Sequence, residues 1–137
     1  MEPIRKYINV VESAQSVEQL AQISDKALDD AYHYGRSTPG ANFGWLANIE
    51  SAKAAKRLID AGETDIEKIS DAIHDGWNIT AMADYNNKLQ LDSPTPDEKK
   101  AKRAKLAQQS YSQLPEEEKE KDRVVARALL NAITSTA

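Results

Sequence analysis

His74 has the widest range of chemistry of any residue in this chain, because an imidazole can act as an acid, a base or a metal ligand near neutral pH. It lies three residues before Trp77, on the border of an apolar stripe. The other histidine, His33, is followed by no HExxH-type spacing and the chain has no cysteine, so we predict no metal site and no cofactor. General base catalysis with Asp71 or Asp75 is an alternative. A packed, hydrogen-bonded histidine is the interpretation we favour, with direct ligand contact as the other.

Arg36 is a second candidate, within the irregular segment Tyr34-Gly35-Arg36-Ser37-Thr38-Pro39-Gly40-Ala41-Asn42. The glycines, the proline and the hydroxyl side chains of this segment disfavour a helix and supply turn chemistry. Backbone N–H groups and an arginine in such a loop can hold an anion at the start of the following helix. The spacing matches neither GxGxxG nor the Walker pattern, so we favour a plain loop between helices, with ligand contact by Arg36 as the alternative.

The charges of the chain are unevenly distributed around a formal net charge of −4. Residues 1–92 carry nine Lys and Arg against 15 Asp and Glu, whereas residues 93–137 carry nine against seven. This balance argues against general binding of nucleic acid and leaves room for a local site for a small anion. The basic run over residues 99–105 belongs to an expected helix at 97–110, which can dock on an acidic partner; a solvated helix face is the interpretation we favour.

Arg123 and Arg127 lie one turn apart on the last expected helix and share one of its sides. Glu120, three residues before Arg123, is an ordinary pair partner for that arginine. Arg127 has no equally obvious acidic partner on its helix. A salt-bridged helix surface is the interpretation that this spacing favours.

Composition predicts a soluble, cytoplasmic protein. The absence of cysteine excludes a disulfide framework. The N-terminus lacks the basic and then apolar profile of a signal peptide, and no apolar run approaches the roughly 20 residues that span a bilayer. We therefore expect no membrane partner.

Helical periodicity dominates the chain, and no stretch alternates like a half-buried strand. We expect an all-α fold, a compact single-domain bundle of about five or six helices. Gly76 weakens its helix locally or allows another backbone to approach closely. The expected helices cover roughly residues 4–14, 17–32, 43–61, 65–85, 97–110 and 116–133.

Three helix starts carry capping patterns. Ser16 with Gln19, and Thr64 with Glu67, have the spacing of a capping box, in which two side chains satisfy free backbone N–H groups. Thr95 precedes a proline and two acidic residues, so we expect it to cap the helix that follows.

Two motifs in the second half of the chain form a pattern. One is a helix with a His-x-x-Trp pair, over residues 65–77, and the other is a Tyr-x-x-Leu-Pro-x-x-x-Lys-x-x-Asp-Arg helix start, over residues 111–123. Together they resemble the RyR domain, a repeat first named in ryanodine receptors and also found in bacterial and phage proteins. The resemblance covers roughly residues 64–134. It departs from the family at residues 78–82, where a Gly-Trp-x-Tyr-Gly segment is missing.

The resemblance implies a division into an N-terminal helical extension, residues 1–62, that packs on an RyR-like helical domain, residues 63–137. It also implies a domain without a catalytic set that recognises nucleotide-derived ligands, including signals used in antiviral defence. Carried onto this sequence, the implied ligand contacts are His74, Trp77, Tyr111, Arg123 and Arg127. An aromatic ring can stack on a base and an arginine can hold a phosphate through two parallel hydrogen bonds.

Three hypotheses about function follow. We favour a non-enzymatic module that binds a nucleotide-like small molecule, as a sponge or a sensor. The alternative is an adaptor for another protein or for a second copy of the chain, which would make a homo-oligomer, through the basic helix at 97–110 or an apolar stripe. A nucleotide hydrolase is the third, although no metal-ligand cluster or carboxylate pair stands out.

Overall fold

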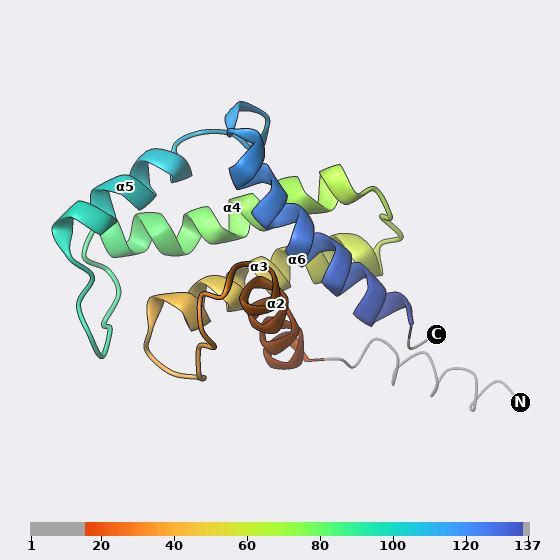
Figure 1. Cartoon of the computed structure of the whole chain (residues 1–137), viewed down its shortest axis with the longest axis horizontal. Coiled ribbons are helices and arrows are strands. Elements are labelled where there is room, and N and C mark those ends of the chain that lie inside the picture. The colour runs from red at the N-terminus through yellow and green to blue at the C-terminus, as the bar shows by residue number, and fades with distance from the viewer. Residues whose placement is uncertain (1–15, 136–137) are drawn as a thin grey trace, which may run out of the picture.

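This computed structural model describes residues 16–135 of the chain. Within this range there are five α-helices and one turn of 3-10 helix (Figure 1). Their order is α2 Val17–Tyr32, α3 Phe43–Asp60, α4 Ile66–Tyr85, α5 Asp97–Ala107, η1 Tyr111–Gln113 and α6 Glu116–Thr134. No strand occurs in this range, and the predicted all-α, single-domain bundle is confirmed. The expected helix at residues 4–14 lies outside the described residues. None of the described helices has both the length and the apolar character that a membrane span requires.

Helices α2 and α4 begin at side chains that satisfy free backbone N–H groups. Ser16 and Gln19 form the predicted capping box, and the Ser16 hydroxyl accepts a hydrogen bond from the Gln19 N–H at 3.0 Å. The prediction that Thr64 caps α4 was wrong. Asp65 is the cap, because its carboxylate, one residue further on, accepts the Glu67 N–H at 2.8 Å.

Helix α5 begins without a side-chain cap, so the prediction that Thr95 caps it was wrong. Pro96 precedes its first turn, and Asp97 and Glu98 in that turn stabilise the positive end of the helix dipole instead. Ala104 is the one residue of α5 that is buried. The helix packs chiefly on α4, and Figure 1 shows it alongside one end of that helix.

One hydrophobic core joins α2, α3, α4 and α6. Its largest fully buried apolar side chains are Leu20 from α2, Ile69 and Ile73 from α4, and Leu129 from α6. Trp45 of α3 is buried in the same core. Full burial of such side chains stabilises the fold by roughly 1.5–3 kcal/mol each. The helices before residue 62 therefore share one core with those after it.

Helices α3 and α4 approach closely at Gly76. A Cβ atom at this position would lie 2.5 Å from the backbone carbonyl oxygen of Glu50, closer than real Cβ contacts come. The second of the two explanations that the sequence allows for Gly76, close approach of another backbone, is the one the structure shows. This contact sets how far α4 stands from α3 along the helices that carry the candidate site.

Candidate ligand-binding cleft

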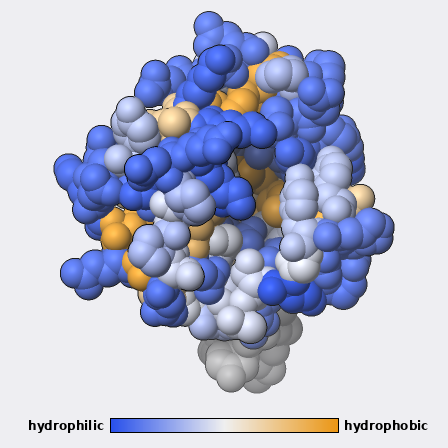
Figure 2. All heavy atoms as spheres, turned by 60° about the vertical axis from the view of Figure 1, so that its left-hand side comes forward, coloured by the Kyte–Doolittle hydropathy of each residue, from blue (hydrophilic) through white to orange (hydrophobic). Residues whose placement is uncertain are grey.

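A cleft of about 660 Å³ opens between the loop after α2, the first half of α3, and helices α4, α5 and α6. Figure 2 shows a hollow with hydrophobic atoms at its base and hydrophilic side chains around its rim. The volume lies within the roughly 300–1,000 Å³ that is typical of sites for small molecules. The cleft exists because α5 packs on α4 and leaves the space toward α6 and the loop unfilled.

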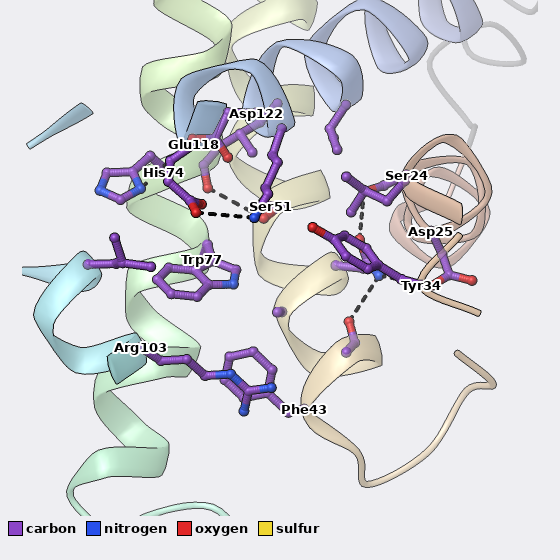
Figure 3. Close-up of a pocket in the computed structure, with 18 of the residues that line it drawn as sticks. Ser24, Asp25, Tyr34, Phe43, Ser51, His74, Trp77, Arg103, Glu118 and Asp122 are labelled. Atoms are coloured by element: carbon purple, nitrogen blue, oxygen red, sulfur yellow. Dashed lines mark hydrogen bonds and ion pairs between the residues drawn. The ribbon is translucent and has the colours of Figure 1, made fainter. Parts of the chain in front are cut away.

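Aromatic side chains form two walls of the cleft. Trp77 projects from α4 and Tyr34 enters from the opposite side (Figure 3). The Trp77 ring is held by Phe43, edge to face at 6.1 Å between centroids, and by His74, nearly parallel at 6.3 Å. No hydrogen bond among the described residues uses the Trp77 indole N–H. Trp77 can therefore offer its N–H edge to a flat ligand. Tyr34 stacks on Tyr32 at 5.5 Å between centroids, and Nζ of Lys121 lies 5.8 Å from its ring centroid.

The α5 side of the cleft is basic. Lys99, Lys102 and Arg103 line it, and neither lysine forms an ion pair within residues 16–135. The Arg103 guanidinium lies 3.7 Å from the centroid of the Phe43 ring, a cation–π contact. Its nearest carboxylate oxygen, on Asp84, is 4.0 Å away, and its buried Nη1 has no hydrogen-bond partner among the described residues. Burial lowers the pKa of Arg103, although Asp84 opposes the shift.

The α6 side of the cleft is acidic, with Glu118 and Asp122 one turn apart. Glu118 pairs with Lys121 at 3.1 Å. Asp122 has an oxygen 3.9 Å from Nδ1 of His74, beyond hydrogen-bond distance. Burial, and then the Glu118 charge, raises the pKa of Asp122 to about 8. Burial therefore favours the protonated, neutral form of the carboxyl group at this end.

His74 is buried and hydrogen-bonded, as the favoured interpretation of the sequence predicted. Its Nε2 lies 2.7 Å from the carbonyl oxygen of Gln109, and because a carbonyl only accepts, Nε2 carries the proton. Its Nδ1 faces Asp122 rather than the cleft centre. Both ring nitrogens are thus directed at the protein, and the carboxylate beside His74 is Asp122 rather than Asp71 or Asp75.

Arg36 does not line the cleft but holds the loop that does. Its Nε donates to Asp25 at 2.7 Å, and the Ser37 N–H donates to the same carboxylate at 3.0 Å and 3.1 Å. Asn48 of α3 donates to the Gly44 carbonyl and accepts from Ser24 at 2.6 Å. These bonds connect α2, the loop and α3, and they leave Tyr34 at the cleft edge.

Tyr111 and Arg123 meet at a different place. The Tyr111 hydroxyl donates to Glu67 at 3.0 Å, and Arg123 donates to the same carboxylate through Nε at 2.8 Å and Nη2 at 3.0 Å. A third donor, Nη1, reaches Glu116 at 3.0 Å. The Arg123 hydrogen bonds hold the pKa of Glu67 below its usual value. The sequence-predicted contacts therefore divide, with His74 and Trp77 in the cleft and Tyr111 and Arg123 in a clasp between α4 and α6.

Arg127 also lies outside the cleft and pairs with Glu120. The sequence shows no acidic partner for Arg127 as obvious as that of Arg123, but Glu120 lies on its side of the helix, because residues seven apart share one face after two turns. Glu120 is shared, since it also approaches Arg123 at 3.5 Å, as the sequence predicted.

Three groups of cleft residues are not among the ligand contacts predicted from the sequence, namely Phe43, the pair Lys99 and Lys102, and the pair Glu118 and Asp122. A signal existed for the acidic pair. Glu118 and Asp122 continue, at helical spacing, the stripe that Val125 and Leu129 bury. Carboxylates on a buried stripe indicate a polar site inside the fold.

No family model, no curated protein and no solved structure matches this chain. The resemblance to the RyR domain, and the ligand class it implies, thus stay predictions. Among residues 16–135, no group of three or more His, Asp or Glu side chains is placed to hold a metal ion.

Proposed function

We propose that this protein binds a nucleotide-derived small molecule in the cleft between α4, α5 and α6 without transforming it, and so sequesters or senses a nucleotide signal. One observation carries the proposal. The cleft combines opposed aromatic rings, Trp77 and Tyr34, with lysines on α5 that have no ion-pair partner in the described chain. The aromatic rings can stack on a nucleobase, and the lysines can bind a phosphate.

The expected affinity can be bounded from these contacts. A well-formed stack contributes roughly 1–3 kcal/mol, and each charge-assisted hydrogen bond roughly 1.5–3 kcal/mol. One stack and two such bonds amount to about 6 kcal/mol, which corresponds to a Kd of tens of micromolar. Titrations should therefore extend to about 1 mM ligand.

The geometry of His74 supports binding rather than turnover. Its Nε2 donates to the Gln109 carbonyl and its Nδ1 faces Asp122, so neither nitrogen is presented to a molecule in the cleft. A histidine that acts as a general base must reach the proton it removes. The resemblance to the RyR domain, a family without a known catalytic set, is consistent with this proposal and extends it to signals of antiviral defence.

The first experiment is to denature the purified protein and identify any released small molecule by mass spectrometry. The second is a thermal-shift scan against mono-, di- and cyclic nucleotides. We expect a stoichiometric nucleotide, or a rise in Tm that grows with ligand concentration as mass action requires. If both experiments are blank, the proposal is wrong. Salt-sensitive association with an acidic protein partner would then favour the adaptor hypothesis.

Two matched tyrosines connect binding to the cleft. Tyr34 and Tyr85 are both exposed, at 58% and 46%, but Tyr34 lines the cleft and Tyr85 does not. We expect Tyr34→Ala to weaken nucleotide binding about ten-fold and Tyr85→Ala to leave the Kd unchanged. Equal effects of the two substitutions would place the ligand elsewhere.

A further inference from the structure

Arg103 lines the cleft with hydrogen-bonding capacity that the described chain does not use. Its side chain is 23% exposed, and no residue between 16 and 135 accepts a hydrogen bond from it. Asp84, on α4, approaches it, but Oδ2 of Asp84 lies 4.0 Å from Nη1 of Arg103, beyond hydrogen-bond distance. A guanidinium carries five N–H donors, and a largely buried one without acceptors has a strong need for them. An anion bound in the cleft can supply these acceptors.

The orientation of Arg103 leaves one edge of its guanidinium for a ligand. Phe43 covers a face of the group, with 3.7 Å between the central carbon and the ring centroid, and Nη1 is buried on the Asp84 side. The remaining edge is the fork of Nε and Nη2, which can hold two oxygens of one anion. Arg123 shows this geometry within the same chain, because its Nε and Nη2 donate to Glu67 at 2.8 Å and 3.0 Å.

Two lysines share the side of α5 that carries Arg103. Lys99 lies four residues before Arg103 and three residues before Lys102, so the three cations are neighbours on the helix surface. All three line the cleft, and neither lysine has an ion-pair partner within residues 16–135. Like charges at this spacing destabilise a helix. The helix therefore holds three mutually repelling cations beside a cavity, and a bound anion would relieve that repulsion.

The net charge of this end of the cleft matches a phosphate monoester. Asp84 offsets one of the three positive charges, whereas Asp97 and Glu98, in the first turn of α5, do not line the cleft. Figure 3 shows Glu118 and Asp122 at the opposite end. About two positive charges therefore remain for a ligand. A phosphate monoester carries about −1.5 to −2 near pH 7 and has three strong acceptor oxygens, whereas a cyclic phosphate diester carries a single negative charge.

Resting on the proposed function, we propose that Arg103 recognises the phosphate of the ligand through Nε and Nη2, and that this phosphate is a terminal monoester. Phe43 positions the guanidinium, and the same ring contacts Trp77 edge to face, so it joins the aromatic wall to the phosphate end. Lys99 and Lys102 add charge without fixing the geometry, because an ammonium group is a point charge. The ligand is accordingly a nucleotide with a free phosphate end, rather than a nucleoside or a cyclic nucleotide.

The test measures the Kd of AMP, 3′,5′-cyclic AMP and adenosine by isothermal titration with the full chain. These probes share one base and differ in the charge of the phosphate, so the ratios of their Kd values report the phosphate contact alone. We expect AMP to bind about 100-fold tighter than adenosine and about ten-fold tighter than cyclic AMP. The corresponding guanine, cytosine and uracil compounds are measured in parallel, because the inference does not depend on the base.

Two substitutions of Arg103 separate the fork from its charge. Arg103→Lys keeps the charge and removes the fork, so the advantage of AMP over adenosine should fall about ten-fold while the Kd of adenosine is unchanged. Arg103→Met keeps an apolar stem against Phe43 and removes the charge, so the advantage should fall further. The ratio is measured on one preparation of each variant, so a loss of folded protein affects both ligands equally and cancels.

Arg57→Lys is the matched control, because Arg57 is exposed in the last turn of α3 and lies outside the cleft. This variant undergoes the same chemical change as Arg103→Lys, and it should keep all the Kd values of the unaltered protein. An equal loss in the control would show that the effect comes from general charge chemistry and would overturn the assignment to Arg103.

Equal binding of each monophosphate and its nucleoside would overturn this inference and leave the proposed function standing, with a base contact alone. Tighter binding of a cyclic nucleotide than of its monophosphate would also overturn it. Retention of the AMP advantage in both Arg103 variants would overturn it and assign the phosphate to the lysines. If no nucleoside or nucleotide binds, and no small molecule is released on denaturation, both proposals fall together.

Discussion

Two arginines of this protein show how differently one residue type can be used. Arg123, between α4 and α6, donates three hydrogen bonds to Glu67 and Glu116. Arg103, on α5, lies over Phe43, and its Nη1 has no hydrogen-bond partner in the described chain. Each nitrogen of the first arginine donates a hydrogen bond, whereas a buried nitrogen of the second has none within the described residues. A bound ligand can therefore accept a hydrogen bond from the guanidinium of Arg103, whereas the nitrogens of Arg123 already donate to carboxylates of the protein.

The contrast extends to the surroundings of each arginine. The clasp of Arg123, Tyr111 and Glu67 is closed on itself, so its contacts account for these residues without a ligand. Within residues 16–135, the cleft has two lysines, Lys99 and Lys102, without ion-pair partners and a carboxyl group, on Asp122, without hydrogen bonds. Unmet hydrogen bonds and charges therefore locate a binding site better than the presence of arginine does.

Charge reversal on α5 should have the largest effect on binding. We expect Lys99→Glu combined with Lys102→Glu to weaken nucleotide binding by about 100-fold or more, because two attractive charges become repulsive. Thermal unfolding should change little, since both side chains are exposed. The matched control reverses Lys88 and Lys105, which are exposed and lie outside the cleft. An equal loss in the control would indicate long-range attraction instead of contact.

The largest effect on stability should be at Asp122. Its folded-state pKa is raised from 3.8 to about 8, so between these values the folded chain holds a proton that the unfolded chain has lost. Stability of the unaltered protein therefore falls as the pH rises through this window and levels off above it. Asp122→Asn should be more stable, by roughly 5 kcal/mol at pH 8 and by little at pH 4. Urea unfolding across this range measures it, and a pH-independent difference would contradict the assignment.

Arg123→Ala should destabilise the fold by about 1 kcal/mol, because its partners Glu67 and Glu116 are exposed and surface ion pairs contribute little. The Kd for a nucleotide should stay within about two-fold, since the clasp is separate from the cleft. Unfolding and titration of the same preparation distinguish the two effects. Loss of binding without loss of stability would show that Arg123 contacts the ligand, as the RyR resemblance implies.

Arg127→Ala should have the smallest effect, within about 0.5 kcal/mol of unfolding free energy. Its side chain is 52% exposed, and its partner Glu120 retains Arg123. The nucleotide Kd should not change. A fall in stability as large as that of Arg123→Ala would show that the two arginines act as one network.

Much of the fold could be predicted from local patterns. The Ser16 and Gln19 capping box and the apolar stripe around Leu129 predict their helices because capping and burial depend on residues within a few turns. The same local patterns failed at Thr64 and Thr95. Caps shift by a residue when a neighbouring side chain or an acidic first turn can satisfy the helix start equally well.

The candidate site could be predicted only in part. His74 and Trp77 share a helix, so their proximity follows from a spacing of three residues. The basic run of α5 predicts a solvated face, because no local feature shows that Lys99 and Lys102 border a cleft. That depends on where α5 packs against α4, which involves residues far from it in sequence.

The sequence by itself determined the helices, their order and the residues that could carry charge or stack, because these depend on composition and on spacing along the chain. Tertiary structure decided which of those residues already have partners. Glu67, 56 residues before Arg123, closes one cluster, and Gln109, 35 residues after His74, occupies Nε2 of the imidazole. The physical reason is that a hydrogen bond requires atoms within about 3 Å of each other, and only packing of the helices brings such distant residues together.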